Sequence, residues 1–232
     1  MSASDMALAP YRILDLADEK GVLAGRLLAD FGAYVIKIEP PEGDPTRRRP
    51  PFVGDDPHPE KSLYWLYRNV NKRGITLNLA SVEGRALLHR LAAGADVLIE
   101  SAKPGTAASL GLDPETLRAV NPRLVHVSVT PFGSDGPYAG YETSDLVAWA
   151  MSGGMYSSGD PDRPPLNAPG TLAYDSAAAY AAAGAMLALY DRAATGEGQH
   201  VEISLHEASL AALVPWSISG YAFNVAHASN PG

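Results

Sequence analysis

The sequence predicts an α/β fold in which a parallel sheet carries helices on both faces. Its N-terminal half alternates short apolar segments of strand character with longer segments of helical character, which is the pattern of successive βαβ units. The first unit consists of YRILDL at 11–16, GVLAGRLLADFG at 21–32 and AYVIKIEP at 33–40. A glycine at position 32 ends the predicted helix, as glycine commonly does.

The same alternation continues to residue 130, after which the chain becomes mainly helical. SVEG at 81–84 places a serine and an early acidic residue where a helix start is expected. The sheet should therefore have at least five strands, with no internal repeat or disordered linker. The further predicted strands are 75–79, 96–100, 124–130 and 200–205, and the further predicted helices are 82–93, 144–152, 174–192 and 205–226.

Composition limits the kinds of partner. The 232 residues carry a formal net charge of -8 with a pI near 5.2, so no nucleic acid or membrane is expected as a partner. The absence of cysteine excludes disulfides and thiolate catalysis and fits a reducing compartment. The first residues lack the features of a secretion signal, which predicts a cytoplasmic protein. The apolar run 177–189 is shorter than the roughly 20 residues of a membrane span and predicts a buried helix.

Four loops are expected to share one edge of the sheet, because ligands bind at the carboxyl ends of parallel strands. No GxGxxG follows the first strand, so we expect no nucleotide cofactor. The histidines show no HExxH or HxxxH spacing, so we expect no metal. The four loops read LADEKG, IEPPEGDP, IESAKPG and VTPFGSDGPY.

Taken together with their surroundings, these loops resemble class III CoA-transferases, the family of formyl-CoA transferase, carnitine CoA-transferase and α-methylacyl-CoA racemase. The resemblance implies a Rossmann-like large domain, a smaller domain and two interlocked subunits. It runs through most of residues 11–213. The segments that carry it are GRLLADFGAYVIKIEPPEGDPTRR, NKRGITLNL, ADVLIESAKPGTAASLGLDPETL, NPRLVHVSVTPFGSDGPY and TGEGQHVEISLHEA.

By this resemblance, residues 1–200 form the Rossmann-like large domain, and 201–232 form a strand and helix leading toward a small domain. Family members are longer, so the small domain and the returning C-terminal segment are expected to be absent from these 232 residues. The chain is then either a fragment or a naturally short relative that completes its fold with another chain. A homodimer, or a heteromer with a second CoA-transferase family subunit, is implied.

The resemblance also implies the chemistry. An aspartate at the start of a helix attacks an acyl-CoA thioester, forming a mixed anhydride and then an aspartyl-CoA thioester, from which the acceptor acid takes the CoA. Asp175 is the acidic residue able to do this. The family spacing, counted back from Gly184 and Arg192, lands on Tyr174, one residue earlier. Either the preceding loop is one residue shorter here, or Asp175 is a helix cap, as aspartates beside helix starts usually are.

Other family positions predict where coenzyme A and the acyl group bind. Coenzyme A is expected as substrate and product, with an acyl-CoA and a carboxylic acid as reactants. Lys72 and Arg73 are candidates for phosphate contact, or else a solvated pair before a strand. The expected CoA-binding residues are Asn71, Lys72, Arg73, Leu77, Ser101, Lys103, Gly105 and Tyr138, and those of the acyl site are Glu19, Lys20 and Tyr174.

Three readings of the function remain open. The first is a CoA-transferase that uses Asp175 as its nucleophile. The second is a non-catalytic partner subunit of a heteromeric class III CoA-transferase, and the third is an inactive fragment. Racemisation is disfavoured, because the family's catalytic histidine position is Ser144 here, and a serine cannot serve as that base.

Overall fold

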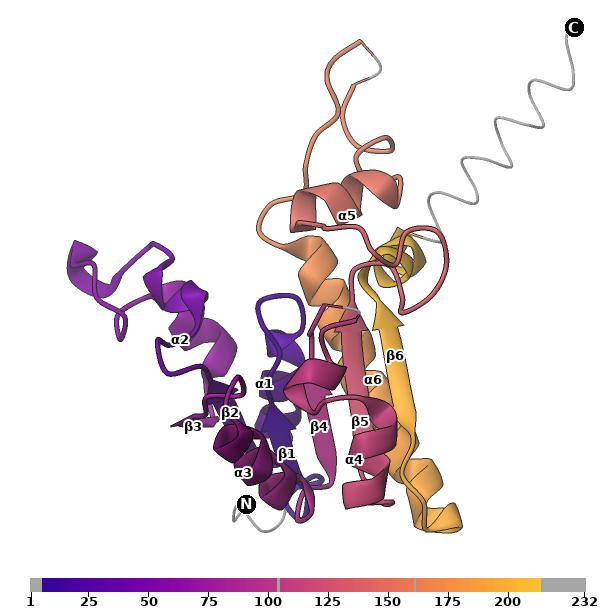
Figure 1. The fold of residues 1–232 in the computed structure, drawn as a ribbon. Helices are drawn as coiled ribbons and strands as arrows, with labels where there is room; N and C mark the ends of the chain where they lie inside the picture. The colour runs from indigo at the N-terminus through magenta and orange to yellow at the C-terminus, as the bar shows by residue number, and fades with distance from the viewer. Residues whose placement is uncertain (1–5, 104, 161, 214–232) are drawn as a thin grey trace, which may run out of the picture.

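In the computed structural model, which describes residues 6–103, 105–160 and 162–213, six parallel strands form one sheet (Figure 1). The strand order is β3-β2-β1-β4-β5-β6, so the chain starts in the middle and builds outward in both directions. This is the Rossmann-like topology, and it confirms the predicted fold class. The strands are β1 Arg12–Asp15, β2 Tyr34–Glu39, β3 Arg73–Thr76, β4 Val97–Glu100, β5 Val125–Thr130 and β6 His200–Ser204.

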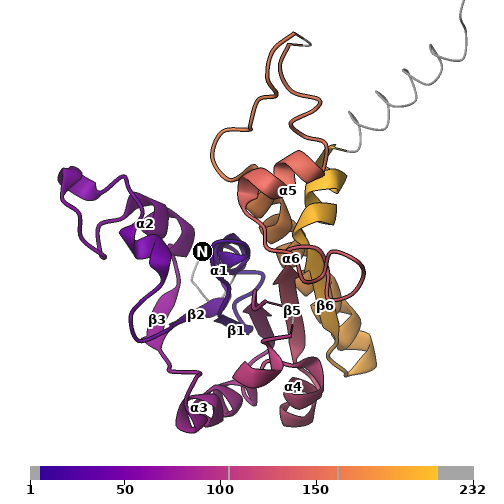
Figure 2. The same cartoon turned by 45° about the horizontal axis from the view of Figure 1, so that its top comes forward.

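Helices cover both faces of the sheet (Figure 2). One face carries α1 (Val22–Asp30) and α6 (Leu172–Thr195), and α5 (Asp145–Met151) packs on α6. The other face carries α3 (Val82–Ala92) and α4 (Pro114–Val120). A further helix, α2, spans Leu63–Asn69 and packs against α1; short 3-10 turns span Pro45–Arg48, Val53–Asp55 and Ala108–Leu110.

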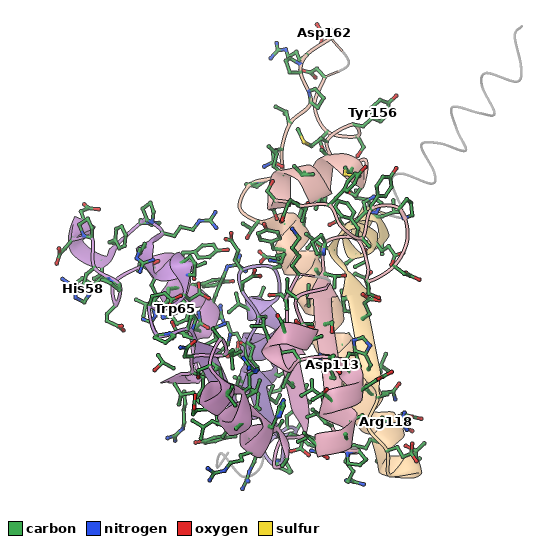
Figure 3. The ribbon with its side chains drawn as sticks, viewed as in Figure 1. His58, Trp65, Asp113, Arg118, Tyr156 and Asp162 are labelled. Atoms are coloured by element: carbon green, nitrogen blue, oxygen red, sulfur yellow. The ribbon has the colours of Figure 1, made fainter. Side chains whose placement is uncertain are left out.

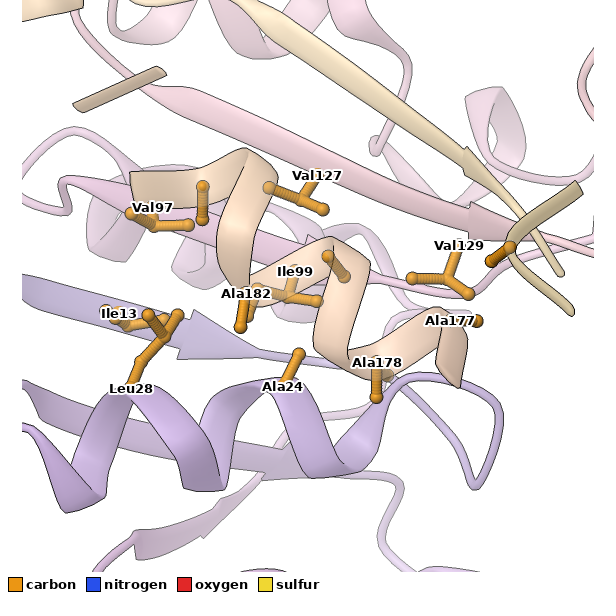
Figure 4. Close-up of a cluster of buried hydrophobic side chains, with 14 of the residues drawn as sticks. Ile13, Ala24, Leu28, Val97, Ile99, Val127, Val129, Ala177, Ala178 and Ala182 are labelled. Atoms are coloured by element: carbon orange, nitrogen blue, oxygen red, sulfur yellow. The ribbon is translucent and has the colours of Figure 1, made fainter. Parts of the chain in front are cut away.

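Small side chains let α6 pack closely against both α1 and the sheet. Figure 4 shows Ala177, Ala178 and Ala182 of α6 between the α1 residues and the valines of β5, and all three alanines are buried. By length and composition alone α6 could cross a membrane, but half of its most apolar window is buried inside this fold. The helix therefore serves as the core helix that the sequence predicts.

Two short helices and one strand position differ from the sequence analysis, which assigned no helix to α2 or α4. Ser62 caps α2 by accepting a hydrogen bond from the backbone N–H of Trp65 at 3.2 Å, and Asp113 caps α4. The third strand spans Arg73–Thr76, so the predicted range of 75–79 was wrong at both ends. Leu77 and Leu79 are apolar because they pack against the core, although they lie beyond the end of the strand.

The end of the described chain agrees with the predicted order of elements. Strand β6 pairs with β5 in the same sheet, and a helix begins at 205 and continues to 213. The remainder of the helix predicted for 205–226 lies outside the described residues. The division at residue 200 into a large domain and a connecting segment stays a prediction.

Candidate functional site

Asp175 lies in the first turn of α6, at the edge of the sheet where the strands end. Its backbone N–H donates to the carbonyl of Thr171 at 2.9 Å, so it is already inside the helix. The cap is supplied from elsewhere: the Asp145 carboxylate accepts a hydrogen bond from the Tyr174 N–H at 3.0 Å. Asp175 is therefore not the side-chain cap of α6, and its side chain is 36% exposed.

A buried arginine holds Asp175 in place. Arg68, in the last turn of α2, donates from Nη1 to Asp175 Oδ1 at 2.5 Å and from Nη2 to Thr171 Oγ1 at 2.5 Å. The guanidinium also stacks on the Tyr64 ring, 4.6 Å from its centroid. No hydrogen bond to the second carboxylate oxygen of Asp175, Oδ2, is present within the described residues. One oxygen is thus fixed while the other is left without a donor.

Glu19 of the predicted acyl site lies beside this cluster. It accepts a hydrogen bond from Arg49 at 2.6 Å and a longer one from the Tyr64 hydroxyl at 3.4 Å. Arg49 also stacks over the Tyr64 ring at 4.1 Å. Burial raises the pKa of Tyr64, so this hydroxyl stays a donor at neutral pH. Tyr64 therefore connects the loop after β1 with the Arg68 and Asp175 pair.

The loop after β1 also includes Lys20, and it lies beside Tyr174 and Ser101. Burial raises the pKa of Tyr174, and the neighbouring carboxylates of Glu19 and Asp18 raise it further. Lys20 forms an ion pair with Asp18, whose Oδ1 accepts a hydrogen bond from Ser101 Oγ at 2.8 Å. The fold thus gathers residues predicted for the acyl site with one predicted to contact CoA.

Lys72 is placed inside the fold rather than at a phosphate-accessible surface. Its ammonium donates to Asp15 Oδ2 at 2.7 Å, to the Val22 carbonyl at 2.6 Å and to Asn69 Oδ1 at 3.0 Å. Its side chain is 1% exposed, and burial lowers its pKa to about 8. Three acceptors therefore already use the three N–H donors of this ammonium.

Two other residues predicted to bind CoA also lie away from Asp175. Asn71 donates to Asp30 Oδ1 at 2.7 Å, which ties the start of β3 to the end of α1. Arg73 is the first residue of β3 and stacks over Tyr34 at 5.1 Å, at the amino end of the sheet. Asp175 lies at the opposite, carboxyl end.

Leu77, in contrast, lines a hollow of about 300 Å³ at the carboxyl ends of the first three strands. The same hollow is lined by Leu16, Pro40 and Leu110, and by Ala80 from the segment that follows β3. The hollow is mostly apolar, and carboxylates of Glu39 and Glu42 lie among its lining residues. It is placed where the topology predicts a ligand.

The remaining predicted residues lie on the exposed loops after β4 and β5. Lys103 forms an ion pair with Glu142, and Gly105 adopts a positive φ of 84°, which suits glycine at this turn. The Tyr138 ring packs against Tyr141 with centroids 5.3 Å apart. The described residues contain no group of three His, Asp or Glu that would suit a metal ion.

Sequence reasoning missed Arg68, Tyr64 and Thr171. The available signal was the four-residue spacing of Tyr64 and Arg68, which puts both on one side of a helix. That helix was not predicted, so the spacing carried no meaning. Figure 3 shows Trp65 on α2, well separated from Arg118 on α4.

A family model described as CoA-transferase family III matches residues 8–231 of the chain. The chain is 42% identical over 203 residues to succinyl-CoA:(R)-benzylsuccinate CoA-transferase subunit BbsE of Thauera aromatica, covering 88% of this chain and 50% of that protein. It is 40% identical over 223 residues to acetyl-CoA:oxalate CoA-transferase of Acetobacter aceti, covering 92% and 56%. The chain thus spans about half the length of the curated relatives it matches.

Solved structures give the same fold. A CAIB/BAIF family protein from Brucella suis superimposes with a TM-score of 0.88 at 38% identity, covering 94% of this chain and 58% of that chain. Rv3272 from M. tuberculosis superimposes with a TM-score of 0.84 at 29% identity, covering 93% and 60%. A mutant of Rv3272 in which an aspartate is replaced by alanine has a TM-score of 0.83, also at 29% identity, covering 94% and 58%.

Proposed function

The chain belongs to CoA-transferase family III, and from this premise we propose that it takes part in moving CoA from an acyl-CoA to a carboxylic acid, with Asp175 as the nucleophile. The observation that carries the proposal is the state of Asp175. It is partly exposed, it is not used as a helix cap, and it keeps Oδ2 without a hydrogen-bond donor in the described residues.

The proposed reaction uses the carboxylate as an acyl carrier and then as a CoA carrier. Oδ2 of Asp175 attacks the thioester carbonyl, the C–S bond breaks, and a mixed anhydride and CoA thiolate result. The thiolate attacks the aspartyl carbonyl, which releases the donor acid and leaves an aspartyl-CoA thioester. The acceptor carboxylate attacks that thioester, which breaks its C–S bond, releases CoA thiolate and forms a second anhydride. The thiolate then attacks the acceptor's carbonyl in this anhydride, which gives the new acyl-CoA and frees Asp175.

Arg68 supports this chemistry by fixing the orientation of the nucleophile. A guanidinium that grips Oδ1 and Thr171 together leaves the carboxylate little rotational freedom, so Oδ2 points in a defined direction. We propose that the acyl group lies beside Glu19, Lys20 and Tyr174, which the fold gathers near this pair.

We propose that CoA lies across the carboxyl ends of the first five strands. The apolar hollow that contains Leu77 suits a flat, uncharged ring, and Ser101, Lys103, Gly105 and Tyr138 lie on loops at the same end of the sheet. Lys72 and Asn71 are proposed to act indirectly, since their side chains hold α1 and β3 together.

A second candidate function is that of a non-catalytic partner subunit. It is favoured by the strong ion pair on Asp175, because a carboxylate held by a buried arginine can also be purely structural. One relative at 42% identity is itself designated a subunit, and a succinyl-CoA–L-malate CoA-transferase beta subunit of Chloroflexus aurantiacus is 37% identical. In this reading, transfer takes place on the other subunit.

The two functions are separated by a CoA-transfer assay of the chain with a panel of acyl-CoAs and dicarboxylic acids, alone and with a second family III subunit. The first predicts that Asp175→Asn lowers transfer at least a thousandfold while the melting temperature is retained. The second predicts that transfer requires the other subunit and is the same for wild type and Asp175→Asn. No transfer in any combination contradicts both.

A further inference from the structure

Three arginines differ from every other lysine and arginine of the protein in their lack of polar side-chain contacts. All 18 lysines and arginines lie in the described residues. Arg12, Arg73 and Arg90 make no side-chain hydrogen bond or ion pair there, whereas each of the others does. In a chain with a net charge of -8, uncompensated cations are unexpected.

The three arginines lie on the same side of the sheet. Arg12 of β1 lies opposite Tyr34 of β2, and Arg73 of β3 lies opposite Ile36, so all of these side chains share one face of the sheet. Arg73 stacks over the Tyr34 ring at 5.1 Å. Arg90 comes from the last turn of α3, which covers the same face.

Two of these arginines, Arg12 and Arg90, line a groove of about 630 Å³ at the amino ends of β1 and β2, whereas Arg73 is connected to it through the Tyr34 ring on which it stacks. Arg12, Arg90 and Tyr34 line it, its floor includes Ile36 and Leu91, and no acidic residue is among its lining residues. Tyr34 is 45% exposed. The groove lies at the end of the strands opposite Asp175, so it is separate from the site described above (Figure 1).

We propose that this groove binds a nucleoside polyphosphate. Guanidinium groups match phosphate oxygens with paired hydrogen bonds, and Arg12 and Arg90, the two arginines that line the groove, make no other side-chain hydrogen bond or ion pair in the described part of the chain. The Tyr34 ring and the apolar floor provide a surface for a flat base. The volume lies within the range of small-molecule sites, and no acidic residue among those described lines the groove to repel a polyanion.

The same chemistry has two sources, a free nucleotide and the nucleotide portion of CoA. Titration calorimetry of the full chain with ATP, ADP, pyrophosphate, adenosine and CoA distinguishes them. We expect saturable binding of ATP and pyrophosphate. We also expect Tyr34→Leu to weaken ATP while leaving pyrophosphate unchanged, because only the nucleotide carries a ring to stack.

The decisive comparison is between Arg12→Gln/Arg90→Gln, the double variant, and Arg118→Gln/Arg163→Gln, the control. The control residues are exposed arginines paired with Glu197 and Asp160, so the control matches the loss of two charges without touching the groove. The double variant should lower ATP affinity at least tenfold and the control less than twofold. If CoA binding falls in parallel, the groove holds the nucleotide portion of CoA, and CoA does not lie at the carboxyl ends of the strands as proposed above; if CoA binding is unaffected, the ligand is a free nucleotide.

Three results would overturn the proposal. The first is no ATP binding by the wild type, and the second is equal weakening by the double variant and the control, which indicates non-specific charge. The third is a change in molecular mass by light scattering in the double variant, which would make the groove a contact between protein chains. Both double-variant positions are exposed, so folding is checked simply by the melting temperature.

Discussion

At the scale of single residues, the most constrained group is the buried carboxylate of Asp15 with its two lysines. Asp15 is fully buried, and Lys72 and Lys37 approach its two oxygens at 2.7 and 3.9 Å. Removing one partner of such a cluster leaves an uncompensated charge inside the fold, which costs about 3–5 kcal/mol. This cluster is therefore structural, and it joins β1, β2 and the segment before β3.

Lys72 makes the stability depend on pH in a particular direction. Its pKa is lowered to about 8 in the folded state from 10.5, so between these values the unfolded chain binds more protons. Unfolding free energy should therefore rise with pH from about 8 toward 10, by at most about 1.4 kcal/mol per pH unit. Urea unfolding at pH 7.5, 8.5 and 9.5 measures this slope.

The matched variant is Lys72→Met, which keeps the length of the side chain and removes the titrating group. The difference between wild type and variant should grow in favour of the wild type as pH rises through this window. A difference that stays constant or shrinks contradicts the assignment of Lys72 as a buried ammonium.

Arg68 is the residue that distinguishes an oriented nucleophile from a structural ion pair. Arg68→Met should lower the turnover of CoA transfer about a hundredfold, because Asp175 then rotates freely and loses the adjacent positive charge. Steady-state kinetics of the assembled enzyme measure this, with Arg49→Met as the control for losing a neighbouring arginine. Unchanged turnover in Arg68→Met, with retained folding, would assign the pair a structural role.

Sequence reasoning singled out Asp175 as a site candidate but gave no way to choose between nucleophile and cap, and its role as nucleophile stays a prediction. That Asp175 is not the cap depends on Asp145, which is thirty residues away in the chain and reaches the same helix end only through the packing of α5. Lys72 illustrates the converse. A lysine beside an arginine before a strand suggests surface charge, and only the fold reveals that it points inward.

At the scale of elements, the start of α6 is set by a tertiary contact. Thr171 provides no side-chain cap, and Asp145 from the start of α5 accepts the Tyr174 N–H instead. Asp145 is 9% exposed, and this burial raises the pKa of its carboxyl group. Position and orientation of Asp175 thus depend on how α5 packs against α6.

Asp145→Ala should lower the unfolding free energy by about 1–2 kcal/mol, the usual effect of losing a cap. Asp145→Asn keeps an acceptor oxygen and should lose less than half of that. Urea unfolding at pH 7 measures both. Equal losses in the two variants would indicate that charge, rather than the hydrogen bond to Tyr174, is what stabilises this helix start.

The elements themselves were predictable in proportion to their length and periodicity. The long α6 contains an extended alanine-rich apolar run, β4 is apolar over its first three residues, and β5 alternates valine with polar residues, so their existence followed directly. The short α2 did not, because seven residues rich in aromatics resemble a strand as much as a helix. α4 carried a readable signal that was not used, an aspartate cap followed by proline at the first helical position.

At the scale of the whole molecule, one face of α6 remains uncovered and apolar. Leu187 and Tyr190 are 71% and 83% exposed, and Tyr180 and Met186 lie on the same helix at 43% and 39%. Exposed apolar surface of this kind commonly marks a contact with another chain. We propose that a second copy of this chain covers it.

Leu187→Lys/Tyr190→Lys should therefore shift the protein toward the monomer, measured by sedimentation velocity over a range of concentrations. Val82→Lys/Leu87→Lys is the matched control, since Val82 and Leu87 are 69% and 44% exposed on α3, on the opposite face of the sheet. A monomeric wild type, or a dimer that persists in the double variant, contradicts this use of the surface.

The central claim is that Asp175 forms a covalent intermediate, and mass spectrometry after hydroxylamine treatment tests it most directly. The chain, alone and with a second family III subunit, is mixed with a panel of acyl-CoAs, trapped and digested. A hydroxamate on the peptide that contains Asp175, absent when the acyl-CoA is omitted and absent in Asp175→Ala, is the predicted result. An unmodified peptide with every donor, alongside a modified aspartate on the second subunit, would contradict it.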